Sequence, residues 1–139
     1  MILDHVPGPD ENSAAFWAAT AEHRLTVQSC TSCGHVQHPP RALCTGCGSM
    51  DHLAQVDVAG TGVVDSFTVI HRGPRPDVEV PYTIARVRLS EGPVLLTQLV
   101  GADPEGWSID APVSVAWADL PDGRALPVFT PSPDQTKEH

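Results

Sequence analysis

The sequence predicts a mainly β protein, in which a small barrel of five strands follows one short helix and a cysteine-rich segment. From about residue 53, short runs rich in Val, Ile and Thr alternate with Gly and Pro breaks, as in all-β domains. All four cysteines fall between residues 30 and 47, as two CxxC pairs. Only residues 10–22 have a clearly helical composition.

Residues 1–24 are expected to form an irregular lead-in followed by the helix. Two prolines and a glycine occupy positions 7–9 and favour irregular structure. Asp10 or Asn12 can cap a helix that ends near Glu22, and alanines favour helix between them. Phe16 and Trp17 supply its bulk. We expect these two side chains to pack internally, and docking of a partner protein is the alternative.

Residues 25–52 are expected to form a zinc ribbon. Residues 25–29 alternate apolar and polar side chains as a strand does, and lead directly to the first cysteine. A glycine follows each CxxC pair, where the backbone must turn tightly toward sulfur. The four predicted zinc ligands are Cys30, Cys33, Cys44 and Cys47. Four thiolates leave zinc no open position, so the predicted ion is structural rather than catalytic.

Two other interpretations of the cysteines stay open. A pair of disulfides would need an oxidising compartment, which the N-terminal residues do not indicate. Iron also accepts four thiolates, and spacing alone does not separate it from zinc. His35 and His38 lie close by in the sequence, and we expect them to be neighbours of the metal rather than ligands.

Residues 53–130 are expected to form the barrel, with residues 131–139 as a flexible tail. In the second predicted strand Arg86 and Arg88 share one face and apolar residues the other, so the arginines should point outward. The predicted strands are Thr61–Ile70, Tyr82–Leu89, Val94–Val100, Val113–Ala118 and Ala125–Phe129.

Composition and the lack of several motifs argue against some classes of protein. The balance of 8 basic against 17 acidic residues, a net charge of -9, opposes diffuse attraction to nucleic acid. No apolar run is long enough to cross a membrane, and the first residues do not resemble a signal peptide, so we expect a cytoplasmic protein. The sequence contains no GxSxG and no phosphate-binding glycine motif, and every cysteine is already assigned to the ribbon.

A small group of cationic side chains is the remaining candidate site. Two arginines on a Gly-Pro loop next to a histidine could bind phosphates through charge-assisted hydrogen bonds, and the two strand arginines could extend such a patch. The candidates are His71, Arg72, Arg75, Arg86 and Arg88. A solvated arginine face is the favoured alternative.

The order of these parts resembles the DUF35 family of OB-fold proteins with a rubredoxin-like zinc ribbon. The resemblance is carried by FW in the helix, LTVQSCTSCGHVQHPPRALCTGCGS, GTGVVDSFTVIHR, VPYTIARVRLSEGPVLLTQLVG and the closing LPVFTP, over about residues 13–131. It implies that the five strands form an OB barrel. It also assigns the metal to the four cysteines and carries over no catalytic residues.

The resemblance further implies an accessory subunit in a hetero-oligomer. Proteins similar to this one are partners of thiolase-like acyl-CoA enzymes, including aldolases of steroid side-chain breakdown, thiolases and acyltransferases of lipid metabolism. The partner would carry the catalytic residues, and the acyl-CoA thioester would lie at or near the interface, bordered by the cationic candidates. Two alternatives stay open: a single-stranded nucleic-acid-binding OB module, and a chain with acyl-CoA chemistry of its own.

Overall fold

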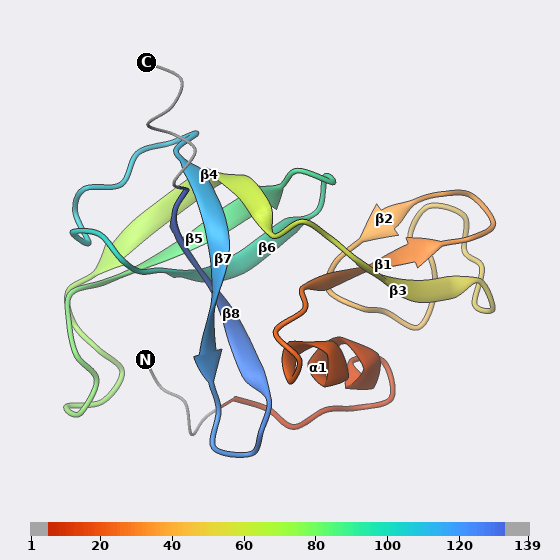
Figure 1. Cartoon of the computed structure of the whole chain (residues 1–139), viewed down its shortest axis with the longest axis horizontal. Coiled ribbons are helices and arrows are strands. Elements are labelled where there is room, and N and C mark those ends of the chain that lie inside the picture. The colour runs from red at the N-terminus through yellow and green to blue at the C-terminus, as the bar shows by residue number, and fades with distance from the viewer. Residues whose placement is uncertain (1–5, 133–139) are drawn as a thin grey trace.

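A computed structural model describes residues 6–132, which form one helix and two sheets (Figure 1). The elements in order are α1 (Ala14–Thr20), β1 (Thr26–Cys30), β2 (Val36–Gln37), β3 (Leu53–Asp57), β4 (Thr61–Ile70), β5 (Tyr82–Leu89), β6 (Val94–Leu99), β7 (Pro112–Asp119) and β8 (Ala125–Pro131). One sheet has the order β2-β1-β3, and the other is a closed barrel in the order β4-β5-β6-β8-β7. The predicted fold class, mainly β with a five-stranded barrel after one short helix, is confirmed.

Side-chain alternation explains the barrel. Along β5, Arg86 and Arg88 are exposed, while the residues between and beside them are buried, as predicted. The barrel interior is filled by side chains with 0% exposure, namely Val64, Val87, Val113 and Phe129. The observed ends of the barrel strands lie within two residues of the predicted ends, and β8 extends to Pro131. The expected tail beyond residue 132 lies outside the described residues.

The smaller sheet differs from the sequence interpretation in its strands. β1 pairs antiparallel with both β2 and β3, in a register that sets Cys30 opposite Leu53. Residues 53–57 therefore belong to the ribbon sheet, although we expected residue 53 to begin the barrel. Their short apolar and polar pattern fits either sheet, and only the pairing with β1 assigns them. We propose the boundary between the two parts at residues 58–60.

Helix α1 is shorter than the expected span from Asp10 to Glu22. The Asp10 carboxylate accepts hydrogen bonds from the N–H groups of Asn12 and Ser13, which makes a turn before the helix instead of its first turn. At the other end His23 adopts a φ of 57°, a left-handed conformation that a helix cannot continue through. Within residues 6–132, no helix has the length and apolar character needed to cross a membrane.

A connection of three residues joins the ribbon sheet to the barrel. At its start the Val58 N–H donates to the Leu25 carbonyl over 3.0 Å, and at its end the Gly60 carbonyl accepts from the Val115 N–H over 2.7 Å. Gly60 has a φ of +79°, and a Cβ there would lie 2.5 Å from a Val115 methyl carbon. Only glycine fits this position, and the connection is fixed to both sheets.

Candidate metal centre and neighbouring surfaces

The two CxxC segments form turns with the same backbone hydrogen bonds. In the first, the Gly34 N–H donates to the Cys30 carbonyl over 2.8 Å, and the Cys30 N–H donates to His35 over 2.9 Å. In the second, the Gly48 N–H donates to the Cys44 carbonyl over 2.8 Å, and the Cys44 N–H donates to the Ser49 carbonyl over 2.9 Å. Gly34 and Gly48 have φ values of 80° and 81°, a left-handed conformation that glycine adopts without strain.

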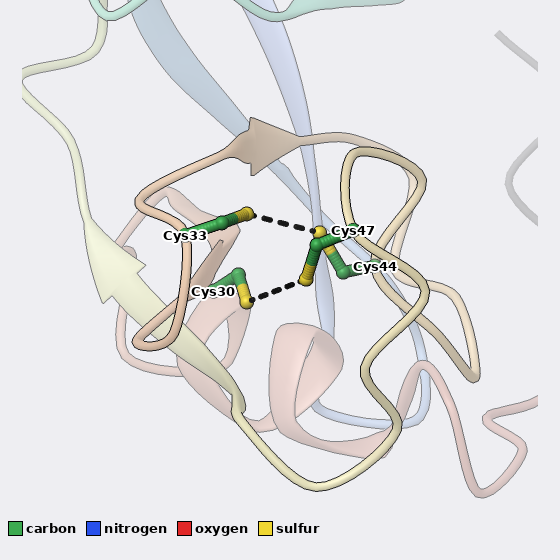
Figure 2. Close-up of side chains that lie close together, drawn as sticks. All are labelled: Cys30, Cys33, Cys44 and Cys47. Carbon is green, nitrogen blue, oxygen red and sulfur yellow. Dashed lines mark hydrogen bonds between the residues drawn. The ribbon is translucent and has the colours of Figure 1, made fainter.

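The two turns bring the four cysteine sulfurs together. All four lie within 4.8 Å of one another, and Figure 2 shows them pointing toward one centre. The sulfurs of Cys30 and Cys47 are 3.7 Å apart, and those of Cys33 and Cys44 are 3.6 Å apart. A tetrahedral zinc with Zn–S bonds of about 2.3 Å places its sulfurs about 3.8 Å apart, whereas a disulfide requires about 2 Å. The donors and their spacing fit a four-coordinate metal.

The crowded thiols change one another's acidity. Burial disfavours the Cys44 thiolate, but hydrogen bonds from the N–H groups of Cys47 and Gly46 outweigh it and lower the pKa of Cys44 to about 6. The His35 N–H acts in the same direction on Cys33, yet burial and the neighbouring thiols raise the pKa of Cys33 to about 12. Metal ligation requires all four thiolates at once, and their negative charges repel one another. A bound cation would offset this repulsion.

Two buried glutamines hold the loop between the cysteine pairs, and the sequence interpretation missed them. The Gln37 amide donates to the Gln28 side-chain oxygen over 2.6 Å, and its own oxygen accepts from the N–H and hydroxyl of Thr45, both at 2.9 Å. The Gln28 amide nitrogen donates to the Arg41 carbonyl, and the Gln28 side-chain oxygen accepts from the Arg41 N–H, both over 2.9 Å. This glutamine pair positions the second cysteine turn against β1 and β2.

The histidines near the ribbon take other partners. His35 shares a hydrogen bond of 2.9 Å with the Thr45 hydroxyl, and His52 one of 2.7 Å with Ser49. His38 packs its ring 5.3 Å from the ring of Phe16, and burial lowers its pKa to about 4, so its imidazole is neutral near pH 7. None of these three belongs to the group of four sulfurs.

The structure brings three of the five cationic candidates together. His71, Arg72 and Arg75 lie on the loop between β4 and β5 and line a hollow of about 400 Å³. Acidic side chains stand beside two of them, with Glu105 3.9 Å from His71 and Asp77 3.2 Å from Arg75. The loop offers cationic groups to a ligand, within a mixed electrostatic environment.

The two strand arginines lie apart from that loop. Arg88 pairs with Asp65 over 2.5 Å on the outer face of the barrel. Arg86 borders a separate hollow of about 190 Å³, beside Phe67 and Leu96. These contacts give the two arginines surroundings different from those of the loop, and the single extended patch considered from the sequence is not seen.

The two helix aromatics have different surroundings. Phe16 is buried in the core between α1 and the barrel. Trp17 is half-buried, and the guanidinium of Arg124 lies 4.6 Å from its ring centre. Internal packing is therefore the observed role of Phe16, and only Trp17 presents part of its ring to the surface.

An N-terminal helix, a four-cysteine ribbon and a five-stranded barrel together define a zinc-ribbon OB-fold protein. Residues 17–52 match a family model described as "ChsH2, rubredoxin-like zinc ribbon domain", and residues 55–118 match "ChsH2, C-terminal OB-fold domain". A solved structure named "Ltp2-ChsH2(DUF35) aldolase" is 40% identical with a TM-score of 0.83, covering 91% of this chain and 98% of that chain. The chain belongs to the DUF35 family.

Other relatives are longer or more distant. A probable enoyl-CoA hydratase alpha subunit of Thermomonospora curvata is 40% identical over 93% of this chain, and a 3-oxo-4,17-pregnadiene-20-carboxyl-CoA hydratase alpha subunit of Mycobacterium tuberculosis is 35% identical over 84%. The chain spans only 40% and 37% of their respective lengths. A DUF35 protein of unknown function from Sulfolobus solfataricus, 19% identical, has the same fold with a TM-score of 0.63, covering 88% of this chain and 85% of that one.

Proposed function

We propose that this chain is an accessory, non-catalytic zinc-containing subunit of a thiolase-like acyl-CoA enzyme of steroid side-chain or lipid degradation. The observation that carries the proposal is the likeness to the Ltp2-ChsH2(DUF35) aldolase, because the chain corresponds to 98% of that solved chain. The name of the Mycobacterium tuberculosis relative, a steroid-type acyl-CoA hydratase subunit, supports the substrate class. The catalytic residues would lie on the partner.

The metal proposed for the ribbon is zinc, bound by Cys30, Cys33, Cys44 and Cys47. These thiolates would close the coordination sphere, and the ion would supply folding free energy to a segment with few apolar contacts. Elemental analysis of the purified chain should give about one zinc per chain and no colour. A red protein with visible charge-transfer bands would instead assign iron.

The partner would dock on the ribbon and on the exposed part of Trp17. Coexpression of the tagged chain with a thiolase-like protein encoded beside it should yield a stable complex on size-exclusion chromatography. Aldol cleavage, thiolysis or acyl transfer should then appear only with both chains present. Turnover by the chain alone, or failure to bind each thiolase-like neighbour, would contradict the accessory role.

The loop of His71, Arg72 and Arg75 would border the CoA part of the thioester. Charge-assisted hydrogen bonds from arginine are suited to its phosphates. Replacing Arg72 and Arg75 together by Gln should weaken CoA binding to the chain or its complex about tenfold in calorimetry, a loss of about 1.4 kcal/mol. Arg41→Gln, which removes an exposed arginine of the ribbon, is the matched control. Equal weakening by the control would assign the effect to net charge.

A further inference from the structure

The barrel is closed by very few contacts where β6 meets β8. These strands are parallel and share one paired position, Leu99 with Phe129, followed by a hydrogen bond of 2.8 Å from the Val100 N–H to the Phe129 carbonyl. Toward their N-terminal ends, the Thr97 hydroxyl bonds the Pro127 carbonyl over 2.9 Å. Pro127 has no N–H to donate, so the ladder cannot continue there. Figure 1 shows β8 running away from β6 in this region.

A cleft of about 380 Å³ occupies the space between the diverging strands and α1. We call it the seam cleft. Its walls are Phe16 and Trp17 from α1, leucines of β6 and β8, Pro127, and His38 from the ribbon. The side chain of Leu96 is 73% exposed, the highest value among the exposed large apolar side chains of residues 6–132. The cleft is the meeting point of helix, ribbon and barrel.

The lining of the seam cleft is uncharged. No Asp, Glu, Lys or Arg side chain is among the residues that line it, and its polar members include Thr97 and Gln98. His38 is neutral near pH 7, because burial lowers its pKa to about 4. An apolar, concave site of this size falls in the range of small-molecule sites, about 300 to 1,000 Å³. Its charge state favours an uncharged apolar group, because a charged one would lose its hydration without a partner.

A second hollow shares one wall with the seam cleft. Gln98 lines both, and the other walls of the second hollow include Glu79, Pro81 and Tyr82, at the end of the loop of residues 71–80 and directly after it. Ile84, at the near wall of the cleft, follows Tyr82 by two strand residues, about 7 Å. One ligand with a polar end and an apolar end can therefore follow a single face of the barrel.

We propose that the seam cleft binds the uncharged apolar ring system of the acyl group, while the thioester's CoA end extends toward the cationic loop. The identity of the acyl group rests on the proposed function. Recognition of the rings is a property of this chain, since its own helix, ribbon and barrel supply every wall. The accessory subunit would then select the substrate as well as dock its partner.

Progesterone, an uncharged steroid ketone, is a suitable probe because Trp17 in the wall reports its binding by fluorescence. Titration of the full zinc-loaded chain should give saturable quenching. Leu96→Glu should weaken binding at least about tenfold, because it places a carboxylate at the cleft. Ile109→Glu is the matched control, since Ile109 is another exposed aliphatic residue, 55% exposed, that does not line the cleft. Zinc content and circular dichroism should be unchanged in both variants.

Two further measurements make the result decisive. Equilibrium dialysis of the native chain should give the same dissociation constant as the quenching, and Trp17→Phe should remove most of the fluorescence change. Octanoyl-CoA tests a linear acyl chain, and its binding without progesterone binding would overturn the ring assignment. No saturable progesterone binding, or equal loss in the Leu96 and Ile109 variants, would overturn the site. Progesterone binding without any thiolase-like partner complex would leave the site intact and refute only the accessory role.

Discussion

The ribbon and the barrel bury different kinds of side chain. In the barrel the residues at 0% exposure are the apolar Val64, Val87, Val113 and Phe129, together with Thr83, whose hydroxyl donates to the Pro104 carbonyl. In the ribbon the buried positions include two cysteines and the glutamine pair of Gln28 and Gln37. Apolar burial stabilises the barrel without a ligand, whereas the ribbon depends on polar contacts and on the metal that its sulfurs fit. The two regions should therefore respond to different substitutions.

The largest effect is expected from removal of one cysteine. Cys30→Ser should release zinc and unfold the ribbon, because structural zinc sites of this kind supply about 10 to 16 kcal/mol of apparent binding free energy. Zinc analysis and amide hydrogen exchange would show loss of metal and of protection in β1–β3, with protection retained in β4 and β5. Ser32→Ala, inside the same turn, is the control. Retained zinc in the Cys30 variant would refute the closed four-sulfur site.

The converse substitution lies in the barrel core. Phe129→Ala should lower the free energy of unfolding by about 3 to 5 kcal/mol, because it leaves a cavity at a fully buried position. Urea unfolding measures the loss, and zinc content of the folded variant should not change. Ile109→Ala, at an exposed position, should cost less than about 0.5 kcal/mol. Loss of zinc from the folded Phe129 variant would show that the two regions are not separable.

His38, where the ribbon packs against α1, should make the free energy of unfolding depend on pH. The folded protein protonates it near pH 4, whereas the unfolded chain does so near pH 6.5. The unfolded state therefore holds more protons between these values, and stability should fall as the pH falls through this window. The loss attributable to His38 is about 2 kcal/mol between pH 6.5 and pH 5. His38→Phe should remove this part of the slope in urea unfolding of zinc-loaded protein, and an unchanged slope would contradict the assignment.

The smallest effect is expected at the glutamine pair. Gln37→Leu leaves the Thr45 N–H without its acceptor and should destabilise the ribbon by about 1 to 2 kcal/mol. Competition with a chromophoric chelator should show weaker zinc binding, while the urea midpoint of the barrel stays constant. Gln37→Glu keeps the acceptor for Thr45 but turns a buried carboxylate oxygen toward the Gln28 side-chain oxygen and the Leu43 carbonyl, so it should give a decrease at least as large. If both variants bind zinc as the native chain does, the pair has no role in positioning the second turn.

The sequence predicted the barrel well because its signal is local. The alternation along β5 and the Gly or Pro breaks between strands can be recognised from neighbouring residues alone. The predicted ends of the barrel strands therefore lie within two residues of the observed ends. The pairing of Leu53–Asp57 with β1 could not be predicted, because five residues do not specify which sheet they join. The helix was overextended because the Asp10 side chain makes a separate turn, which competes with helix at that end.

In the candidate metal centre, too, the sequence predicted the local features and missed the contacts between distant segments. The spacing of the cysteines predicted the sulfur cluster, because each CxxC turn is a local structure. The glutamine pair joins residues from β1 and β2 with the loop at Thr45, and no sequence signal marks such a contact. The surroundings that separate Phe16 from Trp17 depend on how α1 lies against β8 and the ribbon. The sequence indicated that both aromatic residues could pack internally or dock a partner, and only the fold shows that Phe16 is buried and Trp17 half-buried.

The short connection through Gly60 has a mechanical consequence. Hydrogen bonds from Val58 to Leu25 and from Val115 to Gly60 clamp both of its ends, and no side chain but hydrogen fits at Gly60. The ribbon and the barrel therefore cannot swivel about this joint without breaking those bonds. A partner protein bound to the ribbon would therefore also fix the orientation of the barrel.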